Sequence, residues 1–139
     1  MKTVKLYYFD SSEVFAKSKP YIHAKDCYGN IFRVATNFID KFRTGKWKVA
    51  YGYMSIAKGI YCRHCFILNE QRNVIDPTLF LLEPKERPEY LLMFSFERFD
   101  IYFDAIQRER YYPALINYLK EHDVLARSEA NEKNIILID

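Results

Sequence analysis

Cys27, His64 and Asp76 are the residues of this 139-residue sequence whose types and positions best suit nucleophilic chemistry. A cysteine attacks as the thiolate, which a helix N-terminus or a neighbouring imidazolium stabilises. Cys27 stands at the start of a predicted helix, and His64 is the only one of three histidines in a predicted core strand. A catalytic histidine needs a third group that holds its ring in one orientation. Asp76 is our candidate for that group.

A predicted hairpin brings His64 and Asp76 together. The polar loop 69–73 joins two strand-like segments and has the length of a hairpin connection. A turn centred near Gln71 places Asp76 opposite His64, or one diagonal step away, on the same face of the sheet. Asp76 lies within an apolar run, where an unpaired carboxylate would be costly. We therefore expect the two side chains to meet.

The elements that position these residues alternate between helical and strand periods. Apolar residues recur every three or four positions over 27–42, which predicts a helix with one buried face. Ser11–Glu13 offers a further helix start before Pro20. Other helices are predicted over 99–112 and 113–122, and strands over 2–9, 47–55, 61–68, 74–80, 90–96 and 134–139. This order predicts an α+β fold in which a Cys-bearing helix packs on an antiparallel sheet that bears the His and the Asp, followed by C-terminal helices.

The order of motifs over about residues 20–80 resembles the transglutaminase-like branch of the papain-like superfamily. The matching features are Cys27 at a helix start, a strand containing Gly52-Tyr53, His64 followed by an aromatic strand, and Asp76-Pro77-Thr78. The resemblance implies that Cys27 is the nucleophile, His64 the base and Asp76 the orienting group. It implies proteolysis, deamidation, transamidation or another acyl transfer, without a cofactor. Three candidates could stabilise the oxyanion: the backbone amides at the helix start, the side chain of Tyr21 and the side chain of His23.

Composition narrows the classes of protein to consider. Half of the residues are hydrophobic and 28% are charged, which is typical of a globular chain, and we expect one domain over 1–139. The net charge is only +3 with both signs scattered, so nucleic acid is not an expected partner. No segment has the length of a membrane span, and an odd number of cysteines favours a reducing compartment. We expect a cytoplasmic protein that acts on a protein or peptide.

Other local patterns were weighed against this interpretation. Cys62, on the same strand face as His64, is a rival nucleophile without a helix N-terminus. A zinc site is suggested by the cluster of Cys62, His64 and Cys65. Cys65 faces the other side of a strand, however, and no fourth ligand follows, so we expect no metal. The segment 44–46 lacks the other glycines of a phosphate loop, and 108–112 suits a solvated helix face.

A different class of function is also compatible with the composition. The chain has 12 tyrosines and 11 phenylalanines, and tyrosine is favoured at protein interfaces. The alternative is a non-catalytic binding module or inhibitor that uses the same fold and a tyrosine-rich surface. An enzyme requires an accessible Cys27 beside His64, whereas a binding module does not.

Overall fold

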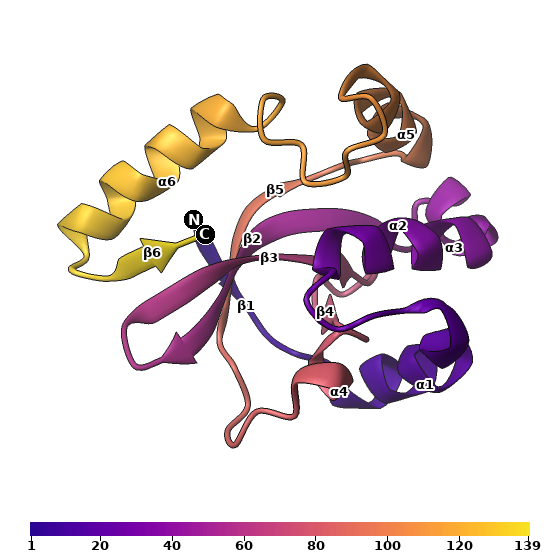
Figure 1. Ribbon diagram of the computed structural model, residues 1–139, viewed down its shortest axis with the longest axis horizontal. Helices are drawn as coiled ribbons and strands as arrows, with labels where there is room; N and C mark the ends of the chain where they lie inside the picture. Colours follow the sequence, from indigo (N-terminus) through magenta and orange to yellow (C-terminus); the bar gives the residue numbers. More distant parts are fainter.

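A six-stranded sheet organises the chain in the computed structural model, which describes all residues 1–139 (Figure 1). The strand order is β1-β5-β2-β3-β4. Strand β6 pairs with β3 as well, at the opposite end of β3 from β4. All pairings are antiparallel except the parallel pairing of β3 with β6. The strands are β1 Lys2–Val4, β2 Lys48–Ala57, β3 Ile60–Leu68, β4 Val74–Ile75, β5 Tyr90–Ser95 and β6 Ile136–Ile138. Both ends of the chain thus contribute strands to the same sheet.

Six α-helices and one short 3₁₀ segment surround this sheet. In Figure 1, α5 and α6 lie above the sheet, whereas α1 and α4 lie below its β4 end. None of the helices combines the length and the apolar character that crossing a bilayer requires. The helices are α1 Tyr8–Ser18, η1 Lys19–Tyr21, α2 Cys27–Asn37, α3 Ile39–Arg43, α4 Leu79–Leu82, α5 Phe99–Arg108 and α6 Lys120–Glu132. The general prediction of a mixed α+β fold is confirmed.

The side-chain alternation of β3 divides the core into two parts. Cys65 and Ile67 belong to the larger core, which also contains the buried face of α2. Phe66 and Leu68 belong to the second core, on the other side of the sheet. Successive residues of a strand point to opposite faces, so the even-numbered His64 shares the face of Phe66.

The predicted hairpin is confirmed in its register and corrected in its length. Ile67 pairs with Ile75 and Leu68 with Val74, which sets Asp76 one diagonal step from His64. The strand predicted over 74–80 ends at Ile75, however, and α4 occupies part of that range. Pro77 has no backbone N–H to donate to a ladder, so the strand cannot continue through it.

The predicted helix over 27–42 is interrupted at Phe38. Its backbone leaves the helical region there, at φ −112° and ψ 34°, and α3 starts at the next residue. The bend lets the rings of Phe38 and Phe42 both contact Trp47, at centroid distances of 5.8 and 6.0 Å. Aromatic packing therefore outweighs the continuity of the helix.

The predictions at the two ends of the chain need larger corrections. The helix predicted over 113–122 starts only at Lys120, because the residues before it form turns. Backbone groups there bond to side chains elsewhere: Tyr51 donates to the Pro113 carbonyl at 2.6 Å, and the Tyr118 N–H donates to Glu109 at 2.6 Å. The helix predicted over 99–112 ends at Arg108. The strand predicted over 2–9 ends at Val4, and its last two residues start α1.

Gly52 is required where β2 passes between β3 and β5. It pairs with His64 on one side and with Leu92 on the other, next to a register shift in the β2–β5 ladder. A Cβ at this position would lie 1.9 Å from the Leu91 carbonyl oxygen, which is part of the backbone. The strand that supports His64 therefore depends on a residue without a side chain.

We expect Gly52→Ala to lower the free energy of unfolding by about 3 kcal/mol, because β5 must move away from β2 to relieve the overlap. Gly59→Ala is the control, since nothing lies within 4 Å of its Cβ and only its φ of 75° is unfavourable. That control should cost roughly 1–2 kcal/mol. Urea unfolding followed by circular dichroism measures both. Equal losses in the two variants would contradict the close approach of β2 and β5.

Candidate active site

The N-terminus of α2 holds Cys27 as its first residue. Asp26 caps the helix by accepting a bond from the Gly29 N–H at 3.3 Å. The same carboxylate pairs with Arg33 at 2.7 Å, and Arg33 also donates to the Tyr21 carbonyl at 2.8 Å. These contacts fix the start of the helix and the segment before it. Cys27 is partly buried there, with a free thiol.

A gap in the outer edge of β3 receives this helix start. Along that edge β6 pairs with residues 60–62 and β4 with residues 67–68, so residues 63–66 have a strand partner only on the β2 side. These four residues are nevertheless buried. Helix α2, which Cys27 begins, packs against β3, and the Cys27 thiol is among the groups that raise the pKa of His64. Sequence analysis did not foresee this gap, which allows a helix to reach His64.

His64 and Asp76 form a buried hydrogen bond. The distance from His64 Nε2 to Asp76 Oδ2 is 2.8 Å, and the two residues are only 4% and 0% exposed. Because Nε2 is occupied by Asp76, Nδ1 is the ring nitrogen available to Cys27. The structure therefore joins two of the three residues named from the sequence, His64 and Asp76, and places Cys27 at the start of a helix that packs against β3.

Two further residues hold Asp76 in place. Tyr90 donates to Asp76 Oδ2 at 2.7 Å, and the Asp76 N–H donates to Ser11 Oγ at 3.0 Å. Oδ2 therefore accepts two bonds, whereas the buried Oδ1 has no partner. Neither residue is predicted as part of the site by the sequence. Tyr90 comes from β5, which lies two strands away from β3 in the sheet, and no local spacing links it to Asp76.

The electrostatics of the site favour a protonated His64. Burial by itself lowers the pKa of this imidazole, but the Asp76 carboxylate and its hydrogen bond raise it, with a further contribution from Cys27. The balance raises the pKa of His64 to about 10. A histidine ordinarily titrates near 6.5, so these surroundings favour the imidazolium at neutral pH.

The two other cysteines have less favourable surroundings for thiolate formation. Burial raises the pKa of Cys65 well above its ordinary value, and this residue is fully enclosed. Burial also raises the pKa of Cys62, although His64 opposes that effect. Neither cysteine stands at a helix N-terminus. No three His, Cys, Asp or Glu side chains converge in a way that could hold a metal ion.

The candidates for an oxyanion site fall into two groups. The side chains of Tyr21 and His23 make no hydrogen bond, and His23 is exposed. The backbone of His23 instead supports the helix, because its N–H and carbonyl both bond to Asn30, at 2.8 and 2.7 Å. The N–H groups of Cys27 and Tyr28 donate to no protein acceptor, as expected in the first turn of a helix. These two amides are the better candidates.

Asn30 connects the helix that carries Cys27 with the segment that carries Asp76. The sequence alone did not predict this role. It is fully buried on α2, and its amide donates to Thr78 Oγ1 at 3.1 Å. Thr78 follows Asp76 by two residues. This contact ties the helix that carries Cys27 to the segment that carries Asp76.

Comparison of the chain with family models, with curated proteins and with solved structures gives no match in any of the three.

We expect Asp76→Asn to cost roughly 3–5 kcal/mol of stability, because it leaves a buried imidazolium without its counter-charge. Tyr90→Phe is the matched variant: it keeps the charge pair and removes one hydrogen bond to Oδ2, at about 1–2 kcal/mol. Thermal and urea unfolding of the three proteins at neutral pH measure the difference. An Asp76→Asn variant as stable as Tyr90→Phe would contradict a charged His64–Asp76 pair.

Proposed function

We propose that this protein is a cysteine-dependent hydrolase or acyltransferase in which Cys27 is the nucleophile, His64 the proton carrier and Asp76 the group that orients it. The observation that carries the proposal is the buried 2.8 Å hydrogen bond of His64 to Asp76, with Cys27 at the N-terminus of a helix that packs against the strand of His64. Perturbed groups that converge in this way are characteristic of catalytic sites.

The first half of the proposed reaction forms an acyl-enzyme. The Cys27 thiolate attacks the carbonyl carbon of an amide or thioester, and the electron pair of the carbonyl moves to its oxygen. When the tetrahedral intermediate collapses, the bond to the leaving group breaks and His64 transfers its proton to the departing amine or thiol. A His64 that is charged at neutral pH is ready to donate this proton.

The second half returns the enzyme to its starting state. Neutral His64 removes a proton from water or from an acceptor amine, which attacks the thioester carbonyl. The Cys27 sulfur then leaves as the thiolate, and His64 is again the imidazolium beside Asp76. Water as acceptor gives hydrolysis or deamidation, and an amine gives transamidation.

The free amides of Cys27 and Tyr28 suit the oxyanion that forms in both halves. They point out of the first turn of α2, where the partial positive charge of the helix also lies. Tyr28 is held by stacking on Tyr51 of β2, at a centroid distance of 5.9 Å. This stacking limits movement of the helix start during the reaction.

The surroundings of Cys27 favour a macromolecular substrate. Three cavities of the protein have walls that include none of the three site residues. A small substrate would need an enclosing pocket. A protein or peptide substrate can instead be held by the surface around the thiol.

The finer fold assignment is part of the same proposal. The order of a Cys-bearing helix, the Gly52 strand, the His64 strand and the Asp76 segment resembles the transglutaminase-like branch of the papain-like superfamily. The register of the hairpin and the position of Cys27 at a helix start support this resemblance.

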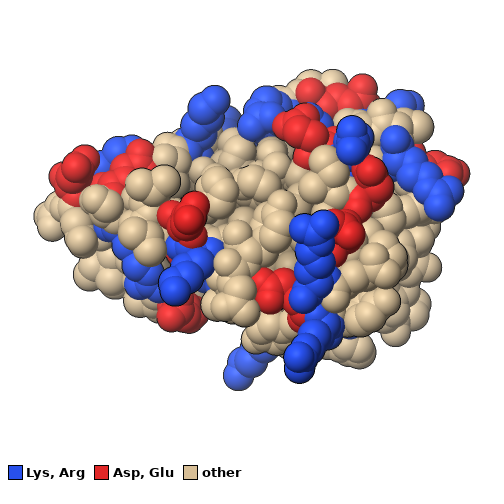
Figure 2. All heavy atoms as spheres, turned by 90° about the horizontal axis from the view of Figure 1, so that it is seen from above, with Lys and Arg blue, Asp and Glu red and all other residues tan.

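The second candidate function is a protein-binding module, and the surface between α5 and α6 favours it. Figure 2 looks down on this face and shows a broad area without charged side chains between more highly charged ends. The connecting segment exposes Tyr111, Tyr112, Ile116 and Tyr118. Arg110 and Tyr111 adopt left-handed backbone conformations, with φ of 54° and 60°. Binding through this surface would not require a reactive Cys27.

We expect iodoacetamide to label Cys27 faster than Cys62 or Cys65 at pH 6–7, because only Cys27 combines a helix N-terminus with a neighbouring imidazolium. His64→Ala should slow labelling of Cys27 by roughly tenfold, since the opposite charge is lost. Labelling is read at each cysteine by mass spectrometry.

The control is His122→Ala, which removes a histidine whose ring contacts Phe94 at a tilt and lies outside the site. It should leave the labelling order unchanged. If Cys62 reacts first, or if Cys27 is as slow in the wild type as in His64→Ala, the proposed enzyme is wrong and the binding module becomes the better account.

A further inference from the structure

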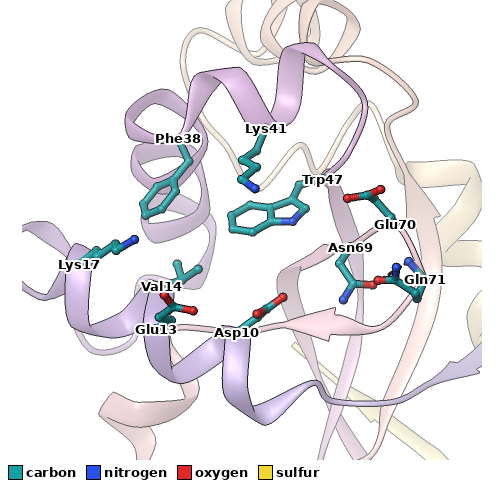
Figure 3. Close-up of a pocket in the computed structure, with 10 residues that line it drawn as sticks. All are labelled: Asp10, Glu13, Val14, Lys17, Phe38, Lys41, Trp47, Asn69, Glu70 and Gln71. Carbon is teal, nitrogen blue, oxygen red and sulfur yellow. Dashed lines mark hydrogen bonds between the residues drawn. The ribbon is translucent and has the colours of Figure 1, made fainter.

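A separate cavity of about 320 Å³ lies between α1, α3 and the β3–β4 loop (Figure 3). Asp10 and Glu13 of α1 point into it from one side. Lys41 of α3 reaches toward it from the opposite side, and Lys17 extends into it from the end of α1. Its volume suits a small molecule and not a macromolecule.

The charged groups around this cavity have no partners of opposite charge within the protein. Asp10, Glu13, Lys17 and Lys41 form neither an ion pair nor a side-chain hydrogen bond with one another or with any other residue, and the same holds for Glu70. Exposed charges of opposite sign at this spacing normally pair on a protein surface or remain apart in open solvent. Here they line the same hollow without pairing.

The charged side chains on the two sides of the cavity nevertheless influence each other electrostatically. Burial and the neighbouring Glu13 raise the pKa of Asp10, and the positive charge of Lys41 opposes this rise. The negative group of α1 and the positive group of α3 therefore lie within range of each other. A ligand with one charge of each sign would complete the interaction.

The remaining wall is apolar and aromatic. Val14, Phe38 and Trp47 line it, and the Phe38 and Trp47 rings stack with a centroid distance of 5.8 Å. Lys41 Nζ lies 5.4 Å from the centre of the Trp47 ring. This arrangement offers an apolar surface between the two charged sides.

We infer that this cavity binds a small zwitterion of amino-acid size, whose ammonium group contacts Asp10 and Glu13, whose carboxylate contacts Lys41 and Lys17, and whose apolar side chain packs on Phe38 and Trp47. The site is distinct from the thiol site and does not rest on the proposed function. Helix α2 connects the two, because Cys27 is its first residue and Phe38 follows its last.

Trp47 is the only tryptophan of the chain, so its fluorescence reports on this cavity alone. L-Leucine is the probe, with N-acetyl-L-leucine and L-leucinamide as analogues that lack the positive or the negative charge. We expect L-leucine to change the Trp47 emission saturably, and each analogue to bind at least about tenfold more weakly. Isothermal titration calorimetry gives the same affinities independently of fluorescence.

Asp10→Asn and Lys41→Gln should each weaken L-leucine binding by roughly tenfold. Asp40→Asn and Lys46→Gln are the matched controls, since both positions are exposed and outside the cavity wall, and they should bind as the wild type does. Absence of saturable binding by both methods, or equal binding of the two analogues and L-leucine, would overturn the inference. So would equal losses in the control variants. No outcome depends on Cys27, so failure here is distinguishable from failure of the thiol chemistry.

Discussion

The buried contact between His64 and Asp76 is the interaction on which the candidate active site depends. A charged imidazole and a carboxylate inside a protein are costly unless each compensates the other. The compensation here is built from several elements: the β3–β4 hairpin sets the two residues one diagonal step apart, and Tyr90 of β5 donates to the same carboxylate oxygen. The pair therefore belongs to the sheet as a whole and not to one loop.

The position of Cys27 follows from a constraint on β3. A strand with a partner along its whole outer edge would keep a helix terminus away from His64. Because β6 pairs with β3 only as far as Cys62 and β4 pairs with it only at Ile67 and Leu68, the edge between them is left to the start of α2. Asn30 then bonds to Thr78 and closes the site from the other side. The discontinuity of the edge leaves the stretch of β3 that carries His64 open to the helix that carries Cys27.

Local patterns were sufficient to predict the parts of the site that lie close in the sequence. The 69–73 loop determines the hairpin register, so the proximity of His64 to Asp76 could be derived from spacing alone, and the periodicity after Cys27 identified the start of α2. Contacts made across the sheet could not be derived in this way. Tyr90 reaches Asp76 only because β5 lies beside β2, and residues 113–119 form turns because Tyr51 and Glu109 bond to their backbone. Both depend on strand order, which no short window of sequence contains.

The most direct test of this account is the protonation of His64, followed by ¹⁵N NMR of its imidazole ring between pH 5 and 11. The account predicts a ring that stays positively charged through neutral pH and loses its proton near the pKa of about 10 that Asp76 and Cys27 maintain against burial. Cys27→Ala should lower this pKa, because the contribution of the thiol is lost, whereas Cys62→Ala should change it less. A His64 that is neutral at pH 7 in the wild type, or whose titration is the same with and without Cys27, would contradict the coupling of Cys27, His64 and Asp76.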